Sequence, residues 1–409
     1  MKVAVIGGGW AGIAAAVELT ASGIATTLFE AGRVLGGRAR SITVAGQALD
    51  NGQHILLGAY RDCLALMRRV GADPEQLLSR HPLRIIDNDG FGLALPHLPT
   101  PFNLAWGLLT ARGISPGEKL QTALWMESLK KHYFRLAKDS TVSAWLDAAG
   151  QTGKLRHHLW EPLCLAALNT PAERASAQLF ANVLRDSLGS TRRQDTDLLL
   201  PRAPLGALLP EPAAHWLAAK GACLRLGNRV TRLSPLADAI DVDGERFTAA
   251  ILATAPQHAA RLCSGLAVGN YDYEPIATVY LQFSPGTALA FPLINLIGHF
   301  GQWVVDRSQG LLACILSGHG DWEKLSDDAL ARTLQEELKT RETPLWHKII
   351  REKRATFSAR PGLLRAASDT AHRSLFLAGD HTWSDYPATL EGAVRSGRHA
   401  ARRLITTRT

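Results

Sequence analysis

Three glycines close to the start of the chain constrain the fold more than any other feature of the sequence. Gly7, Gly9 and Gly12 follow the short apolar run of residues 3–6 and open a run of helix formers with apolar spacing at residues 11–20. In such a unit the first glycine permits a tight turn, the second lets a pyrophosphate approach the backbone, and the third lets the helix lie close to the strand. The unpaired N–H groups at the helix N-terminus favour anions. The spacing therefore predicts a dinucleotide-binding βαβ unit.

A second strand completes this unit. Residues 25–30 form another short run with strand character, and Glu30 stands at its end. A carboxylate at this place can accept hydrogen bonds from ribose hydroxyl groups, and it opposes a 2′-phosphate. The sequence thus argues against NADP as the ligand of this unit.

Length and composition set the broad class of the protein. The chain has 409 residues, enough for two domains, and its 46% hydrophobic and 20% charged residues are ordinary for a folded protein. No nucleic-acid-binding motif accompanies the net charge of +8, so we expect no nucleic-acid partner. The five cysteines lie far apart without metal-ligand spacing, which predicts reduced thiols and no metal site. The sequence shows neither a signal-peptide pattern nor an apolar stretch of about 18 residues, and we expect a cytoplasmic protein that does not span a membrane.

Apolar periodicity and turn residues predict the remaining elements. Helices are expected at residues 61–70, 118–138, 142–149, 173–188 and 327–339, and strands at residues 248–253, 276–283, 311–316 and 349–357. Hairpins are expected to turn at residues 88–90 and 243–244. Residues 96–117, rich in Pro, Leu, Phe and Trp with few charges, are interpreted as an insertion. A strand at 375–378 and a helix at 389–404 repeat the logic of the first unit.

The segment after the second strand carries a resemblance to a known family. Residues 30–38 consist of an acid, a loop and a Gly-Gly-Arg sequence. This pattern resembles the flavin-containing amine oxidase and carotenoid-desaturase superfamily. The resemblance implies FAD as cofactor, with Glu30, Arg33, Gly37 and Arg38 among the residues that bind it and Arg38 along the pyrophosphate.

The end of the chain is similar to the closing motif of the same superfamily. The motif covers residues 375–380 and 390–397, and the resemblance implies cofactor contacts from Gly379, Asp380, Glu391 and Gly392. A carboxylate at a strand end suits the ribityl hydroxyl groups, and a second helix N-terminus suits the second phosphate. No cysteine follows Cys314, so we expect the FAD to be bound without a covalent link.

The two ends of the chain must meet on one FAD, so the cofactor domain is expected to be discontinuous. Residues 227–233 resemble the family strand whose backbone, near Val230, meets the adenine. We expect an α/β fold with a Rossmann-like FAD-binding domain of the amine-oxidase type and an inserted α+β substrate domain. The predicted cofactor domain comprises residues 1–82, 205–265 and 366–409. The predicted substrate domain, a mixed sheet with a helical cap, comprises residues 83–204 and 266–365.

The middle of the chain resembles one branch of the superfamily. Residues 50–60 are similar to a segment of plant-type phytoene desaturases, which indicates a polyprenoid substrate. Residues 160–171, 174–177 and 182–186 resemble the bacterial hydroxysqualene dehydroxylases. That family reduces hydroxysqualene to squalene in hopanoid biosynthesis. The resemblance therefore implies a reductive dehydroxylation at the expense of reduced FAD.

Such a reaction needs a flavin hydride aimed at an allylic carbon and a proton for the departing hydroxyl group. His54 is the candidate proton donor, and Asp50 is a second candidate. Three alternatives stay open: a carotenoid-type desaturase running the reaction in the opposite direction, an amine oxidase, and a flavoprotein that acts only as a scaffold. No lysine matching the one near the flavin in amine oxidases can be placed.

The substrate and the electrons set two further expectations. A long apolar substrate needs an apolar tunnel, for which residues 93–109 and the predicted helix 118–138 are the candidates. An amphipathic entrance there could lie on an anionic membrane surface. Only one dinucleotide fingerprint is present, so a separate reductase is the expected source of electrons.

Overall fold

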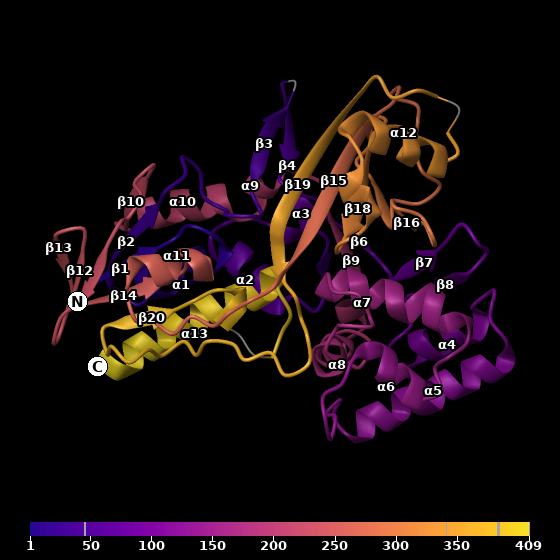
Figure 1. Cartoon of the computed structure of the whole chain (residues 1–409), viewed down its shortest axis with the longest axis horizontal. Helices are drawn as coiled ribbons and strands as arrows, with labels where there is room; N and C mark the ends of the chain where they lie inside the picture. Colours follow the sequence, from indigo (N-terminus) through magenta and orange to yellow (C-terminus); the bar gives the residue numbers. More distant parts are fainter. Residues whose placement is uncertain (45, 341, 383–384, 409) are drawn as a thin grey trace.

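The computed structural model describes residues 1–44, 46–340, 342–382 and 385–408, and it places both ends of the chain in one lobe (Figure 1). This lobe is built on a five-stranded sheet with all neighbouring strands parallel. The strands are, in spatial order, β10 (Cys223–Leu226), β2 (Ala25–Glu30), β1 (Lys2–Ile6), β14 (Ala249–Leu252) and β20 (Leu375–Leu377). Strands from both ends and from the middle of the chain thus share one sheet.

The order of these strands defines where a ligand can bind. From β1 the chain adds β2 and β10 on one side, and later β14 and β20 on the other side. The direction of winding therefore reverses between β1 and β14. In open parallel sheets, ligands bind outside the carboxyl ends of the strands at this switch point. Gly7 directly follows β1, Glu30 ends β2, and Gly379 lies two residues after the end of β20, so all three stand at that edge.

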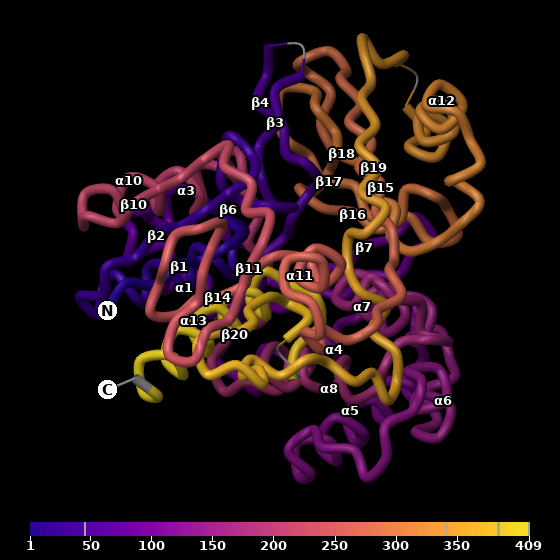
Figure 2. Tube along the Cα trace, turned by 60° about the vertical axis from the view of Figure 1, so that its left-hand side comes forward, coloured from indigo at the N-terminus to yellow at the C-terminus, as the bar shows by residue number. Residues whose placement is uncertain are grey.

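Alternating residues of β1 give the parallel sheet two buried faces. Val3 and Val5 pack with four helices: α1 (Trp10–Ala21), α2 (Arg61–Arg69), α10 (Pro210–Ala219) and α13 (Leu390–Arg408). Ala4 and Ile6 pack with the other face, which is covered by α11 (Pro256–Leu262) and a small antiparallel sheet of β11 (Leu233–Pro235), β12 (Ile240–Val242) and β13 (Glu245–Phe247). Figure 2 shows α13, in yellow, running beside α1 in indigo. The first and last helices of the chain therefore pack on each other.

A second sheet dominates the other half of the molecule. Its strands are antiparallel and lie in the order β16 (Leu293–Asn295), β17 (Trp303–Asp306), β18 (Leu311–Ser317), β15 (Tyr273–Gln282) and β19 (Trp346–Phe357). Ala277, Val279 and Leu281 face a cluster that includes residues of α12 (Asp327–Glu337). The intervening residues Thr278 and Tyr280 point to the opposite side. The period of two in β15 thus separates a helix-covered face from a face directed toward the rest of the molecule.

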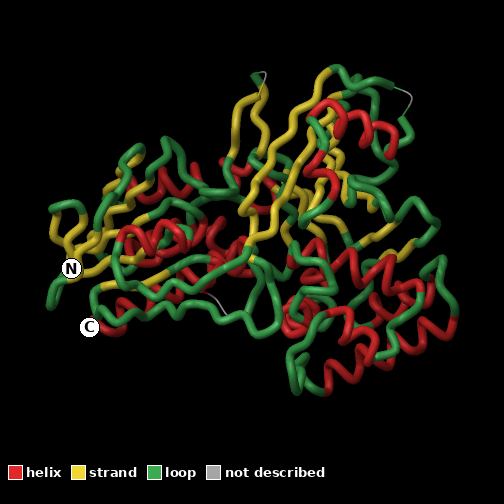
Figure 3. The backbone as a smooth tube through the Cα atoms, viewed as in Figure 1, coloured by secondary structure: helices red, strands yellow, loops and turns green. Residues whose placement is uncertain are grey.

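A group of helices caps this half (Figure 3, red). It comprises α4 (Phe102–Thr110), α5 (Pro116–Lys131), α6 (Val142–Ala148), α7 (Glu161–Leu168) and α8 (Ala177–Asp186), with a π-helical turn at Arg156–Trp160 before α7 and the hairpin β7 (Arg84–Ile86) and β8 (Gly92–Ala94) beside it. Two of these helices differ in length from the predicted ones. The predicted helix 118–138 corresponds to α5, which ends at Lys131 because Tyr133 and Phe134 have φ values of 53° and 56°, outside the helical region. The predicted helix 173–188 corresponds to α8, which begins at Ala177 because Ser176 caps it by accepting a hydrogen bond from the Leu179 amide at 3.1 Å. Helix α4 was not predicted.

Short elements join the two halves. They are the hairpin β3 (Ser41–Val44) and β4 (Gln47–Asp50), the sheet of β5 (Leu56–Leu57), β9 (Leu198–Pro201) and β6 (Leu78–His81), the helices α3 (Pro74–Leu77) and α9 (Leu205–Leu208), and 3-10 turns at Arg193–Thr196, Asp321–Lys324 and Asp380–Thr382. Strand β9 pairs with β5 and β6, although the predicted boundaries assign it to the substrate domain. The exact domain boundaries stay a prediction. No helix within the described residues has the length and apolar character to cross a membrane.

Candidate flavin site and its neighbourhood

The glycine turn after β1 combines one closed position with one open position. A Cβ atom at Gly12 would lie 1.8 Å from the Gly7 carbonyl oxygen, so α1 packs directly against the turn. A Cβ atom at Gly9 would meet nothing nearer than the Gly37 Cα atom, at 3.9 Å. The turn is therefore tight on the side of the sheet and open at Gly9, as the approach of a phosphate group requires.

The beginning of α1 supports the same interpretation. Gly9 precedes the helix, no side chain caps its first N–H groups, and no acidic residue lies in its first turn. These N–H groups and the helix dipole favour an anion. Glu30 stands next to them, where its carboxylate accepts hydrogen bonds from the amides of Gly8 at 2.7 Å and Gly32 at 2.6 Å. Each carboxylate oxygen keeps a second lone pair for a hydroxyl group. Arg33 is exposed in the following loop.

The two ends of the chain meet in an ion pair. The Arg38 guanidinium donates to the Asp380 carboxylate at 2.8 Å and to the Ala355 carbonyl oxygen, on β19, at 2.6 Å. Burial alone would raise the pKa of Asp380, but Arg38 and the neighbouring His381 ring outweigh it and hold the pKa well below its usual range. Asp380 is thus a carboxylate at every physiological pH. Two residues predicted separately as cofactor contacts lie at one place, where the two halves of the molecule meet.

Helix α13 brings its N-terminus to the same region. Thr389 caps the helix, because its hydroxyl oxygen accepts a hydrogen bond from the Gly392 amide at 3.1 Å. Glu391 points elsewhere: it is fully buried, and its carboxylate accepts hydrogen bonds from the first amides of α2, Asp62 at 3.2 Å and Cys63 at 3.0 Å. It also pairs with Arg395 at 2.9 Å. In this setting Glu391 fixes α13 to α2 and holds the helix end in place.

A further part of the site lies beyond β10. The amides of Gly227 and Asn228 donate to the carbonyl oxygens of Gly32 at 2.8 Å and Glu30 at 3.0 Å. This pairing draws residues 227–230 alongside the loop that carries Glu30. Val230 is buried and packs in the cluster beneath that edge of the sheet. Its backbone therefore runs near the place where the dinucleotide fingerprint predicts the adenosine half of the ligand.

His54 lies in the segment that follows β4, close to Arg38. The Asn51 side chain donates to the Arg38 carbonyl oxygen at 3.1 Å, which joins this segment to the glycine loop. The His54 Nδ1–H group donates a hydrogen bond to the Gly52 carbonyl oxygen at 2.9 Å. The Nε2 atom is then the ring nitrogen that can interact with other groups. Burial lowers the pKa of His54 below its ordinary value, and the charge of Arg38 lowers it further. The ring is therefore mainly neutral at pH 7.

Asp50 is enclosed by the protein and is not accessible as an acid would need to be. Its side chain is fully buried, it accepts a hydrogen bond from the Leu205 amide at 2.7 Å, and it lies 3.4 Å from the Arg307 guanidinium. Burial raises its pKa, while the Leu205 amide and Arg307 oppose the rise. Asp50 thus ties β4 to α9 and to the antiparallel sheet, and its carboxylate has no exposed surface.

Residues of β15 and of the loop after β17 support this segment, and the sequence did not single them out. The Thr278 hydroxyl accepts a hydrogen bond from the Gln53 amide at 3.2 Å, and the Tyr280 hydroxyl donates to the Asp50 carbonyl oxygen at 3.1 Å. Arg307 also reaches the Gln53 side-chain oxygen at 3.3 Å. The alternation of β15 places Thr278 and Tyr280 on one face. That signal was present, but only the fold tells which segment this face contacts.

Two buried polar atoms at the sheet edge have no hydrogen-bond partner among the described residues. They are the Thr254 hydroxyl oxygen, after β14, and the His381 Nε2 atom, after β20. Because buried polar atoms are nearly always paired, such atoms at a ligand-binding edge suit a polar ligand. His381 was not predicted as a site residue, although it directly follows Asp380 in the sequence.

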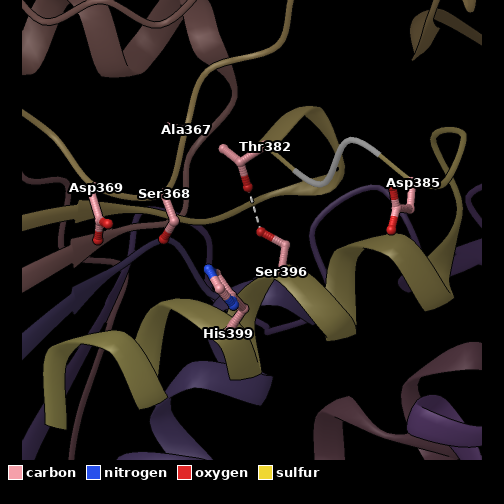
Figure 4. A pocket seen from close by; sticks show the side chains of 7 residues that line it. All are labelled: Ala367, Ser368, Asp369, Thr382, Asp385, Ser396 and His399. Carbon is pink, nitrogen blue, oxygen red and sulfur yellow. Dashed lines mark hydrogen bonds between the residues drawn. The ribbon is translucent and has the colours of Figure 1, made fainter. Parts of the chain in front are cut away.

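A cavity of about 300 Å³ lies beside α13, and its lining includes Thr382 and Ser396. Figure 4 shows Thr382 and Ser396 pointing toward each other across it, joined by a hydrogen bond. None of the predicted site residues lines this cavity. Ser396 instead acts on the site indirectly, since its hydroxyl accepts a hydrogen bond from the Gly379 amide at 2.9 Å and so fixes the strand end that carries Asp380.

Comparison with known proteins assigns this architecture to a family. A family model described as "flavin containing amine oxidoreductase" matches residues 10–405. The hydroxysqualene dehydroxylase of Rhodopseudomonas palustris is 31% identical over 98% of the chain and 97% of its own length. That of Sinorhizobium fredii is 30% identical over the same shares. The chain belongs to the flavin-containing amine oxidoreductases, in the family of the hydroxysqualene dehydroxylases.

More distant proteins share the fold at lower sequence identity. The zeta-carotene desaturase of a Synechocystis strain is 23% identical over 99% of the chain and 97% of its own length. A solved structure of a putrescine oxidase variant has a TM-score of 0.74 at 16% identity and covers 100% of the chain and 99% of that structure. These matches confirm the predicted α/β fold and the predicted family. The protein is therefore an oxidoreductase that uses a flavin cofactor.

The geometry of the site fits that cofactor. An uncapped helix N-terminus, an open glycine and a carboxylate at a strand end stand on one side of the switch point, and a second helix N-terminus with Asp380 stands on the other. Two helix N-termini with a carboxylate beside each match the two phosphates and the sugar hydroxyl groups of a flavin nucleotide. Gly7, Gly9, Gly12, Gly37 and Gly379 would provide the backbone approaches to such a group, and Glu30, Arg38 and Asp380 would provide the polar side chains.

Proposed function

We propose that this enzyme reduces hydroxysqualene to squalene. The observation that carries the proposal is the match to hydroxysqualene dehydroxylases over 98% of the chain at 30–31% identity, against 23% for a carotene desaturase of similar coverage. The segment that predicted this branch, residues 160–171, spans the end of the π-helical turn, α7 and the residues after it. It thus belongs to the helical cap, the part of the fold expected to select the substrate.

We propose FAD as the flavin, bound without a covalent link. A dinucleotide needs two phosphate sites and two sugar sites, and the chain offers two helix N-termini, at α1 and α13, and two carboxylates, Glu30 and Asp380. A mononucleotide would leave Glu30 and the backbone near Val230 without a role. No cysteine lies after Cys314 that could form a thioether with the flavin.

The reaction breaks the bond between an allylic carbon and its hydroxyl oxygen and forms a carbon–hydrogen bond. Bound in its reduced form, the flavin would supply the hydride and be oxidised in place, and one proton would convert the departing hydroxyl group to water. The chain must exclude bulk water from the reacting carbon, hold the apolar substrate, and deliver that proton.

We propose His54 as the proton donor. Its Nδ1 atom is committed to the Gly52 carbonyl oxygen, which fixes the ring and leaves Nε2 as the atom that exchanges the proton. Because its pKa is lowered, only a minority of molecules carry the charged ring at pH 7, but that ring is a stronger acid than an ordinary histidine. The proposal therefore requires faster turnover at lower pH.

Asp50, the second candidate, is better explained as a positioning residue. Its buried carboxylate orients the segment that carries His54 through the contacts with Leu205 and Arg307. An acid with no exposed surface cannot touch the substrate hydroxyl group without a rearrangement of these contacts.

Two partners complete the proposal. A substrate as apolar as hydroxysqualene resides in lipid, so the enzyme works at a membrane surface, and the excess of basic residues favours an anionic one. A separate reductase supplies the electrons, because the glycine fingerprint after β1 is the single dinucleotide fingerprint of the sequence.

The test is an anaerobic incubation in both directions. Purified holoenzyme with a chemical reductant and hydroxysqualene should yield squalene, and oxidised holoenzyme with squalene should yield no polyene, both measured by mass spectrometry. Formation of a polyene from squalene would instead favour a desaturase. Absence of any product in both arms, with flavin bound, would favour the scaffold alternative.

A further inference from the structure

We propose that the outward faces of α4 and α5 form the surface by which this enzyme docks on an anionic lipid bilayer. We call this surface the α4–α5 face; it consists of Phe102, Trp106 and Leu109 on α4 and Leu120 and Leu124 on α5. The inference rests on the proposed function in one respect: an enzyme with a membrane-dissolved substrate needs such a surface.

Helix α4 carries apolar side chains on its outer side as well as its inner side, unlike an ordinary surface helix. Phe102, Trp106 and Leu109 recur at intervals of four and three residues and so form one stripe, and they are 65%, 54% and 66% exposed. The inner side of the helix carries the buried Asn103 and Gly107, and Leu104 and Leu108 pack there against the core. Helices of globular proteins place the apolar stripe toward the core and polar residues toward water. This additional outward stripe, on a helix whose inner leucines already contact the core, indicates that the outer face has an apolar partner.

Helix α5 extends the same surface. Leu120 and Leu124 are 63% and 64% exposed and lie one helical turn apart. The Lys119 ammonium group donates to the Leu109 carbonyl oxygen at the end of α4 at 2.6 Å, which joins the two helices. Of the thirteen strongly exposed large hydrophobic side chains in the described part of the chain, seven lie between residues 98 and 133. Such a concentration marks an interaction surface, whereas single exposed apolar residues do not.

The position of these helices leaves the surface accessible. Figures 1 and 3 show α4 and α5 at the lower right end of the molecule, opposite the lobe that holds both termini. The exposure of its five side chains shows that no segment among the described residues covers the α4–α5 face. The same residues had been candidates for an apolar tunnel, but Phe102, Trp106 and Leu109 point outward.

The charges around the face identify the partner. Helix α4 has no charged residue, while residues 98–138 contain six Lys and Arg against two Glu. Both acids are engaged: Glu118 accepts hydrogen bonds from Ser115 and from the Lys154 amide, and Glu127 pairs with Lys130. An apolar surface with a basic border fits the interface of a bilayer that contains anionic lipid. A second copy of the chain would bring two basic borders together, which disfavours a dimer through this face.

The experiment is co-sedimentation with vesicles of phosphatidylglycerol and phosphatidylcholine, and with vesicles of phosphatidylcholine alone. The test variant is Trp106→Gln with Leu109→Gln. The matched control is Leu345→Gln with Leu364→Gln, which removes two apolar side chains that are 67% and 86% exposed on other parts of the surface. Circular dichroism and thermal unfolding establish that both variants fold as the wild type does.

The wild type and the control should bind the anionic vesicles equally at low salt. The test variant should bind at least ten-fold more weakly, because it lacks two of the large apolar side chains that enter the bilayer interface. Equal binding by the test variant and the wild type overturns the proposal. The proposal is also overturned if the wild type binds both vesicle types equally at low and high salt. It is overturned as well if the wild type is a dimer and the test variant is a monomer. Turnover of detergent-dispersed hydroxysqualene by the wild type tests the proposed function separately, so either idea can fail alone.

Discussion

A methyl group at position 12 would stand 1.8 Å from the Gly7 carbonyl oxygen, 3.0 Å from the Gly7 carbonyl carbon and 3.3 Å from the Ala253 Cβ atom. Gly12→Ala must therefore move α1 away from the turn by roughly 1.5 Å to restore ordinary contacts, which are near 3.4 Å. Forcing one carbon into a packed interface costs about 1–3 kcal/mol. Because backbone rather than a flexible side chain obstructs it, we expect about 3 kcal/mol, together with loss of the flavin.

Gly9→Ala is the matched control for this substitution. A methyl group there meets nothing closer than 3.9 Å, and the backbone φ of −73° suits alanine. Its cost to stability should stay near 1 kcal/mol, the usual effect of alanine at a helix N-cap. It should nevertheless weaken flavin binding, because the methyl group occupies the approach of the phosphate.

Urea unfolding of the apoproteins and flavin titration followed by fluorescence separate the two effects. The expected result is a large stability loss for Gly12→Ala, a small one for Gly9→Ala, and weaker flavin binding in both. If Gly9→Ala binds flavin as tightly as the wild type does, the phosphate is not at this turn. If Gly12→Ala is as stable as the wild type, the close packing of α1 has been misjudged.

Three further predictions concern single side chains. The pKa of Asp380 is lower in the folded state than in the unfolded state, so its contribution to stability is present above about pH 3.8 and is lost as the pH falls through the folded pKa. The difference in unfolding free energy between the wild type and Asp380→Asn should therefore shrink between pH 5 and pH 3. A constant difference would contradict the pairing of Asp380 with Arg38. Turnover should rise as the pH falls from 8 toward the lowered pKa of His54, because more of the rings are then protonated. His54→Ala should abolish this dependence of turnover on pH, and an unchanged pH profile would exclude His54 as the acid. Glu391→Ala should cost about 2 kcal/mol in urea unfolding, because it uncaps α2 and removes one of the carboxylates that hold Arg395, which keeps Asp62 and Asp186. A loss well below about 1 kcal/mol would refute that role.

Local rules were sufficient for the parts of the fold that are formed by neighbouring residues. The glycine spacing and the strand-end Glu30 predicted the first βαβ unit, and the closing motif predicted β20 and α13. Their meeting followed from a single requirement, that both ends bind one cofactor. The ion pair of Arg38 with Asp380 agrees with that requirement at the level of individual atoms.

Roles set by distant contacts could not be predicted in this way. Asp50 looked like a possible acid because the sequence does not show that Leu205 and Arg307 enclose it. Glu391 lies within the closing motif, but its partners are the amides of α2, more than three hundred residues earlier in the chain. In each case only the packing of two remote segments reveals what the side chain holds.

Helix α4 shows a different limit. Its apolar residues were recognised, and the sequence left two roles open for them, the wall of an apolar tunnel and an entrance that lies on a membrane. The inner side of α4 is defined by Gly107, where a Cβ atom would lie 2.5 Å from the Leu95 side chain. The close approach at this glycine turns Phe102 and Trp106 outward.

The central claim is that the flavin of this enzyme reduces an allylic alcohol. The most direct test is a single-turnover experiment without oxygen, in which holoenzyme with fully reduced flavin is mixed with hydroxysqualene and both flavin absorbance and products are followed. The account predicts oxidation of the flavin with one squalene formed per flavin. A flavin that stays reduced, or that becomes oxidised without squalene, would contradict it.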